Sequence, residues 1–196
     1  MYGMVNRAIE EMVCAHYGEN RWAQITARAA IEVDVFVSNE AYPDEMTYAL
    51  VAAASQVLDV PAGQMLEEFG RYWVLHTARI GYGDLLAAGG DSLPQFLYNL
   101  PGFHARVALI YPNLQPPTFR VSDITPTSLH LHYFTHRQGM QSFLIGLVLG
   151  LAELFDTAAT VRPLLLRSAG HDHDVFLIEW PLPTPVAGAA AQMVTP

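Results

Sequence analysis

Cysteine and positive charge are both scarce in this chain. Cys14 is its one cysteine in 196 residues, which excludes an internal disulfide, a Cys-x-x-Cys redox pair and a zinc site built from several thiolates. Lysine and arginine number 10 against 19 aspartates and glutamates, so the formal net charge is -9. Because no basic stripe is present to neutralise phosphates, nucleic acid is not an expected partner.

Long apolar runs and the short motifs of common enzymes are also missing. The longest apolar run extends from Phe143 to Leu151, shorter than the ~20 residues that span a bilayer, so we expect a buried helix. Arg7, Glu10 and Glu11 interrupt the first apolar stretch, so no secretory signal is predicted and the expected compartment is the cytoplasm, with no membrane contact. No Gly-x-Ser-x-Gly, P-loop or His-Glu-x-x-His motif occurs, so we expect no enzyme activity of its own.

Apolar residues are abundant, at 52% of the chain against 15% charged residues, so there is enough apolar surface for a large core and a ligand pocket. Helical spacing or helix-forming composition predicts helices over about 1–16, 21–30, 47–58, 61–81, 92–110 and 139–155. Strands are predicted over 118–124, 128–135, 161–168 and 175–180. We therefore predict one α+β domain over 1–180, helical over about 1–60, with a mainly antiparallel sheet in 61–180 and a loose tail over 181–196.

The segment from Leu131 to Arg137 alternates in character. Tyr133, Thr135 and Arg137 would share one face if the strand continued through them. Two hydroxyl groups and a planar guanidinium on one face can bind a carboxylate. Alternation alone is equally typical of a half-exposed strand.

A single histidine interrupts an apolar helical stripe. The stripe has steps of four and three residues, along Leu93, Leu97, Leu100, His104, Val107 and Tyr111. Spacing alone favours a core histidine with a local hydrogen bond. The functional alternative is an axial ligand, because neutral imidazole binds haem iron and an apolar wall suits a porphyrin.

Several segments together carry a family resemblance. They are Met1 to Asn6, Thr47 to Ser55, His104 followed by Tyr111-Pro112, Pro116 to Arg120, and Tyr133-x-Thr135-x-Arg137. In this order they resemble the H-NOX domain, the haem nitric oxide/oxygen binding family that includes the sensor domain of soluble guanylate cyclase. The resemblance runs from Met1 to about Trp180. His104 lies where that family has its proximal haem ligand, and Tyr133, Thr135 and Arg137 match its propionate-binding Tyr-x-Ser-x-Arg motif.

The resemblance implies a haem-based nitric oxide sensor that also binds carbon monoxide. Haem b would lie between the two lobes, held without covalent bonds, since Cys-x-x-Cys-His is absent. Pro117 matches a proline that packs on the porphyrin. The other walls fall to Val5, Ile9, Trp73 and Phe143, with Ser142 replacing Phe143 if the alignment slips by one residue. Nitric oxide would weaken the His104 bond, and a separate histidine kinase or cyclic-di-GMP enzyme would respond.

Two departures and one alternative accompany this hypothesis. Thr135 replaces the family serine but keeps the hydroxyl, whereas Pro101-Gly102 predicts that the helix kinks or restarts just before His104. The alternative is a small non-haem metal-dependent enzyme. Its candidate ligands are His130, His132 and the cluster His171-Asp172-His173-Asp174. Their spacing is not diagnostic of a metal site, so structural or surface roles are favoured.

Overall fold

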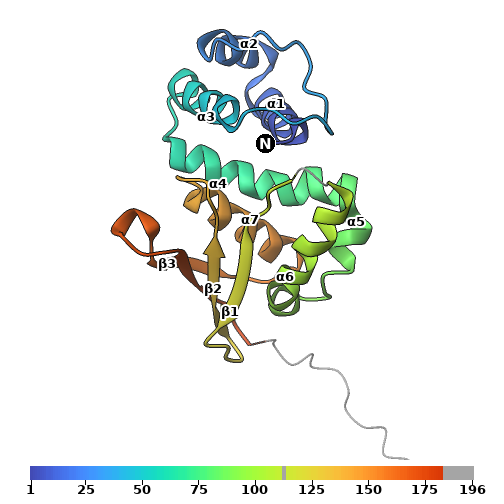
Figure 1. Ribbon diagram of the computed structural model, residues 1–196, viewed down its shortest axis with the longest axis vertical. Helices are drawn as coiled ribbons and strands as arrows, with labels where there is room; N and C mark the ends of the chain where they lie inside the picture. The colour runs from blue at the N-terminus through green and yellow to red at the C-terminus, as the bar shows by residue number, and fades with distance from the viewer. Residues whose placement is uncertain (112–113, 183–196) are drawn as a thin grey trace, which may run out of the picture.

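The computed structural model describes residues 1–111 and 114–182. Most of the predicted tail, from 183 to 196, lies outside the described residues. The amino-terminal helices lie at one end of the molecule, and a sheet lies toward the other end with further helices beside it (Figure 1), so the chain has the predicted α+β architecture.

Three helices form the amino-terminal lobe: α1 (Gly3–Tyr17), α2 (Glu19–Arg28) and α3 (Asp44–Leu58). Their apolar side chains form one buried cluster that includes Ile9, Met12 and Leu50. Gly18 separates α1 from α2 with a φ of 86°, a conformation that glycine adopts without steric cost.

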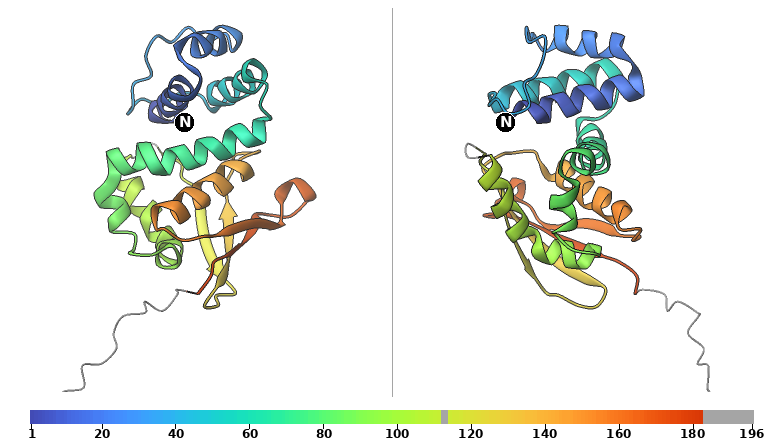
Figure 2. Two further views of the ribbon diagram at one scale, coloured as in Figure 1. Left: turned by 180° about the vertical axis from the view of Figure 1, so that it is seen from behind. Right: turned by 90° about the vertical axis from the view of Figure 1, so that its right-hand side faces the viewer.

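The next helical stretch crosses beneath this lobe (Figure 2). It comprises α4 (Ala62–Tyr72), a π-helical segment (Trp73–Ala78) and α5 (Arg79–Ala87). The sequence predicts one uninterrupted helix from Pro61 to Gly81. The structure instead has wider π-helical turns at Trp73–Ala78 between two α-helical segments. Such turns are frequent at functional sites.

Helix α6 (Leu93–Ile110) begins as predicted at Ser92, whose hydroxyl accepts a hydrogen bond from the Gln95 amide at 3.5 Å. Of the two alternatives predicted at Pro101, a kink or a restart, the structure excludes the restart, because α6 continues through Pro101 and His104 is not near a helix start. Pro101 and Gly102 are both exposed, so they lie on the face of α6 that points away from the core.

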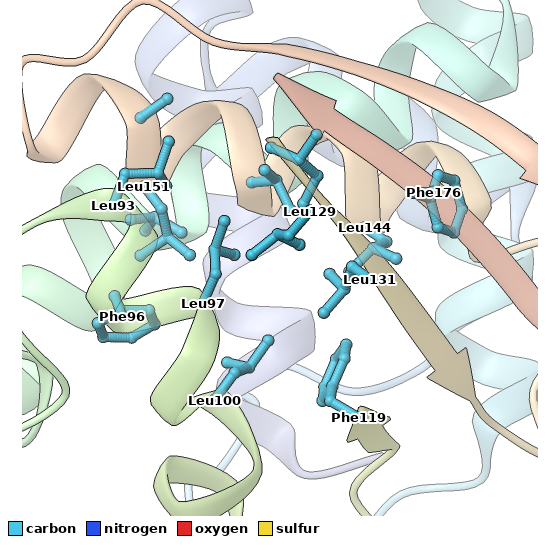
Figure 3. Close-up of a cluster of buried hydrophobic side chains, with 14 of the residues drawn as sticks. Leu93, Phe96, Leu97, Leu100, Phe119, Leu129, Leu131, Leu144, Leu151 and Phe176 are labelled. Atoms are coloured by element: carbon cyan, nitrogen blue, oxygen red, sulfur yellow. The ribbon is translucent and has the colours of Figure 1, made fainter. Parts of the chain in front are cut away.

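Four antiparallel strands form the sheet in the order β1-β2-β4-β3. They are β1 (Thr118–Ser122), β2 (Ser128–Phe134), β3 (Thr160–Leu165) and β4 (Asp174–Glu179). Helix α7 (Gln141–Leu154) packs on the inner face of the sheet, where Leu129, Leu131 and Phe176 join the buried cluster of Figure 3. The apolar run around Phe143 therefore forms the buried helix that its length predicts.

Within the described residues, no single helix is long and apolar enough to cross a membrane. One bent pair, Asp44–Leu58 with Ala62–Ala87 at 112°, has the length and composition of a span.

Candidate functional site

An apolar cavity of about 240 Å³ lies between the amino-terminal helices and the sheet-bearing lobe. Eight of the nine residues proposed from the sequence line it: Val5, Trp73, His104, Pro117, Tyr133, Thr135, Arg137 and Phe143. The fold therefore brings together residues separated by more than half of the chain.

Ile9 is the exception. Its side chain is 2% exposed and packs in the amino-terminal cluster instead of lining the cavity. Val5 lies one helical turn earlier on α1, and that turn reaches the cavity. A contact of Ile9 with a bound ligand therefore stays a prediction.

His104 projects from α6 into the cavity wall. Its Nδ1 lies 3.2 Å from the Leu100 carbonyl oxygen, which can only accept, so Nδ1 carries the proton and Nε2 keeps its lone pair. Burial lowers the pKa of His104, although the hydrogen bond to Leu100 opposes this effect. The Phe119 ring lies 4.9 Å away, centroid to centroid. The imidazole is therefore neutral, oriented and available as a ligand.

Arg137 lies at the rim of the same cavity, beyond the end of β2. Its Nε donates to Asp44 Oδ2 at 2.7 Å, Nη2 donates to Asp44 Oδ1 at 3.3 Å, and Nη1 donates to the Gln115 carbonyl at 3.0 Å. These bonds use three of the five N–H groups of a guanidinium. Among the described residues this leaves two N–H groups for an anion at the rim.

Tyr133 and Thr135 extend this polar rim. Tyr133 is 5% exposed and its ring stacks on Phe119 at 5.4 Å. Burial raises the pKa of Tyr133 to about 12, against the opposing hydrogen bond with Thr135 and the charge of Arg137. The Tyr133 hydroxyl therefore stays protonated near neutral pH and can donate to an anion.

The wall formed by α4 and α7 is aromatic. Phe143 stacks on Phe69 at 5.2 Å, and Phe69 meets Trp73 edge to face at 6.2 Å. The Ser142 hydroxyl instead points toward α4, where it lies 3.2 Å from the position that a Cβ on Gly63 would take. The structure thus places Phe143 in the wall and Ser142 outside the cavity lining.

Sequence reasoning missed several lining residues. They are Met1, Tyr2, Met4, Tyr48, Leu66, Phe69, Tyr82, Tyr111, Met140 and Leu147, among others. Tyr82 and Tyr111 are 29 residues apart, yet their hydroxyls are hydrogen-bonded. The cavity lining therefore holds these two hydroxyl groups as well as the indole N–H of Trp73. No local sequence pattern marks the tyrosine pair.

His130 and His132 of the metal-enzyme alternative lie on the outer face of β2, away from α7, and His171 is an exposed residue before β4. His132 is hydrogen-bonded through both ring nitrogens, to Ser122 at 2.8 Å and to His173 at 2.8 Å, while His173 bonds Asp172 at 2.6 Å. His130 pairs with Asp123 at 2.9 Å. Within residues 1–111 and 114–182, no three His, Cys, Asp or Glu side chains form a group that could hold a metal ion. The geometry does not favour this alternative.

Comparisons with known proteins agree with the fold. The chain is 33% identical over 165 residues to soluble guanylate cyclase gcy-32 of Caenorhabditis elegans, covering 82% of this chain and 24% of that protein. Soluble guanylate cyclase 89Db of Drosophila melanogaster is 23% identical over 155 residues, covering 79% and 23%. The chain thus spans about a quarter of the length of these curated relatives.

Solved structures share the fold. A triple mutant of an H-NOX protein from S. oneidensis, in the Fe(II) ligation state, has a TM-score of 0.85 at 22% identity and covers 94% of this chain and 98% of its own. The unliganded Fe(II) H-NOX protein from K. algicida has a TM-score of 0.81 at 23% identity and covers 92% and 97%. A family model described as haem-NO-binding matches residues 2–162. The chain therefore belongs to the haem-NO-binding, or H-NOX, family of gas-sensing domains.

Proposed function

We propose that this domain is a nitric oxide sensor that holds haem b through His104. The observation that carries the proposal is the neutral His104 ring in the wall of an apolar cavity, with its Nδ1 bonded to Leu100. The cavity suits the flat apolar body of the group, and the rim formed by Tyr133, Thr135 and Arg137 suits its two carboxylates. His104 would hold the ferrous haem, which would supply an iron atom that binds a diatomic gas.

Replacement of His104 by glycine tests this proposal. The cavity should then retain haem weakly, and added imidazole should restore retention by standing in for the lost ring. The readout is the Soret absorbance per protein after desalting. His171→Gly serves as the matched control, because His171 is exposed and should retain haem as the unmodified protein does. An unchanged ferrous spectrum in His104→Gly without imidazole would contradict the assignment.

We further propose selectivity for nitric oxide over oxygen, with carbon monoxide as a second ligand. Bound oxygen draws negative charge and needs a nearby donor, whereas nitric oxide needs little such help. The aromatic wall contributes apolar rings from Phe69 and Phe143. The Tyr48 hydroxyl already donates to the Gln138 carbonyl at 3.1 Å, and the Tyr82 hydroxyl bonds Tyr111 and Met4.

Nitric oxide binding is proposed to release His104 and free α6 to move. A separate signalling protein, a histidine kinase or a cyclic-di-GMP enzyme, would detect the movement. Because a ligand shifts a two-state equilibrium only by contacting the states differently, loss of the His104 bond provides the required difference. The test is a pull-down with the ferrous and the nitric-oxide-bound forms as baits. A partner captured equally by both would contradict the switching mechanism.

A further inference from the structure

Three side chains from three different elements form a hydrogen-bonded chain along one cavity wall. The Tyr82 hydroxyl on α5 lies 3.4 Å from Met4 Sδ on α1 and is hydrogen-bonded to the Tyr111 hydroxyl. A thioether sulfur can only accept, so Tyr82 donates to Met4 and Tyr111 donates to Tyr82. Each tyrosine hydroxyl therefore donates its one proton, and the donors point in one direction, from Tyr111 through Tyr82 to Met4.

The two ends of this hydrogen-bonded series, Tyr111 and Met4, both line the cavity. Tyr111 is the residue directly after α6, and its amide still bonds the Val107 carbonyl at 3.1 Å. Its ring also meets the Tyr2 ring edge to face at 5.2 Å. Met4 belongs to the first turn of α1. The end of the His104 helix is thereby connected to the amino-terminal lobe.

The backbone at Tyr82 explains how its hydroxyl reaches both partners. Tyr82 has φ -141° and ψ 29°, outside the helical region, so α5 is kinked at this residue, between Gly81 and Gly83. Burial is the largest cause of the raised pKa of Tyr82, followed by the hydrogen bond with Tyr111. The hydroxyl therefore keeps its proton throughout the physiological pH range.

Among the described residues, the other direct link between the end of α6 and the start of α1 is the Tyr2–Tyr111 ring contact. Helix α1 packs chiefly against α2, α3 and α4, whereas α6 packs chiefly against β1. The Arg137–Asp44 ion pair also joins the two lobes, but Arg137 follows β2 and is not part of α6. A movement of α6 therefore reaches α1 most directly through the tyrosine side chains.

We propose that Tyr82 is a positioning residue that transmits displacement of α6 to α1 through its bonds to Tyr111 and Met4. The inference rests on the proposed function, because it requires that nitric oxide release His104. Tyr82 does not contact the gas in this scheme. Its hydroxyl couples the two helices, and its ring fills the wall.

Hydrogen exchange measured by mass spectrometry tests the coupling. Exchange in the α6 peptides (93–110) and the α1 peptides (3–17) is compared between the ferrous and the nitric-oxide-bound holoprotein. In the unmodified protein both segments should change. In Tyr82→Phe the α6 change should persist while the α1 change is lost, because the ring remains and the hydroxyl link does not. Tyr98→Phe is the control, since Tyr98 is an α6 tyrosine with 61% exposure, and both changes should persist.

The outcomes separate the two proposals. If α6 responds and the α1 response survives in Tyr82→Phe, the inference is overturned and the sensor function stands. If α6 does not respond in the unmodified protein, the proposed switching fails and the inference fails with it. Should Tyr82→Phe lose haem or misfold, Met4→Leu removes only the acceptor and leaves the tyrosine pair intact. Loss of the α1 response in Met4→Leu supports the inference, and its survival overturns it.

Discussion

At the scale of single residues, Phe143 is the side chain on which gas selectivity most depends. It lines the cavity and stacks on Phe69, and it offers no hydrogen-bond donor. Phe143→Tyr would add a hydroxyl to this wall, and a donor near bound oxygen stabilises its negative charge. We expect oxygen to leave the ferrous spectrum of the unmodified protein unchanged on mixing and to shift that of Phe143→Tyr.

Phe155→Tyr provides the matched control, because Phe155 packs against Phe96 and is not among the cavity-lining residues. Its spectrum should not respond to oxygen on mixing. A rapid oxygen response in the unmodified protein would contradict the proposed selectivity.

Arg137 gives a graded prediction for haem affinity. Arg137→Lys keeps the charge but loses the planar fork, while Arg137→Ala loses both. A hydrogen bond to a charged group contributes about 1.5–3 kcal/mol, so alanine should weaken haem affinity by about ten- to a hundredfold, with lysine in between. Haem transfer to apomyoglobin measures the rate of loss. Equal rates in all three proteins would remove Arg137 from the propionate site.

Some residues of the candidate site can be identified from the sequence and others cannot. His104 and the Tyr133-x-Thr135-x-Arg137 motif stand out through spacing and family resemblance. Asp44, which bonds Arg137 across 93 residues, has no local pattern that connects it to the site. Helical spacing puts Ile9 near Val5, but the packing of α1 decides which turn lines the cavity, and that turn carries Val5.

At the scale of elements, the closest backbone contact is the crossing of α4 and α7. A Cβ on Gly146 would lie 2.0 Å from the Glu67 carbonyl oxygen, and a Cβ on Gly70 would lie 2.3 Å from that of Phe143. No side chain fits there, so the glycines set the helix separation and with it the position of Phe143 over the cavity.

Gly146→Ala should therefore destabilise the fold, because backbone must move to relieve the contact. Overpacking costs about 1–3 kcal/mol, and a backbone clash belongs at the upper end of that range. Gly81→Ala is the control. A Cβ there meets nothing within 4 Å, so helix propensity alone should make it neutral or stabilising by up to about 1 kcal/mol. Urea unfolding of the apoproteins measures both, and equal stabilities would contradict the packing argument.

Regular elements follow from the sequence because their patterns are local. Alternating burial in β2 puts Leu129, Leu131 and Tyr133 on one buried face, although the strand ends at Phe134, before Thr135 and Arg137. The apolar run of α7 predicts a core helix. The π-helical segment was not predicted, since its hydrogen-bonding pattern has no distinct hydrophobic period. At Pro101 a local rule predicted a kink or a restart, and the restart does not occur, since α6 is continuous and Leu97 and Leu100 pack on the core.

At the scale of the whole molecule, two hydrophobic clusters meet around the cavity. One belongs to the amino-terminal helices and includes Phe69, and the other joins α6, α7 and the sheet; Trp73 and Phe143 pack against both. Haem would fill the space between them. Anything that binds the folded state alone stabilises it by mass action, so the two lobes and the group they hold should unfold together.

Asp44 forms polar contacts between the two lobes. Its carboxylate receives Arg137 at 2.7 Å and the amino terminus of Met1 at 2.5 Å, so it joins α3, α1 and the segment after β2. Burial alone would raise the pKa of Asp44, but the hydrogen bonds from the amino terminus and from Arg137 prevail and lower it. The folded protein therefore binds this proton less readily than the unfolded chain.

The lowered pKa of Asp44 sets how the free energy of unfolding changes with pH. A carboxyl group whose pKa is lowered by folding stabilises the fold above its ordinary value of about 3.9, and this stabilisation is lost as the pH falls through the folded value. Asp44→Asn has no such proton to bind. We expect the unmodified apoprotein to lose more free energy of unfolding between pH 6 and pH 3 than Asp44→Asn, with the two curves converging at the acid end. Guanidinium unfolding at several pH values measures the difference. Parallel curves across that range would show that the Asp44 carboxylate contributes nothing to holding the lobes together.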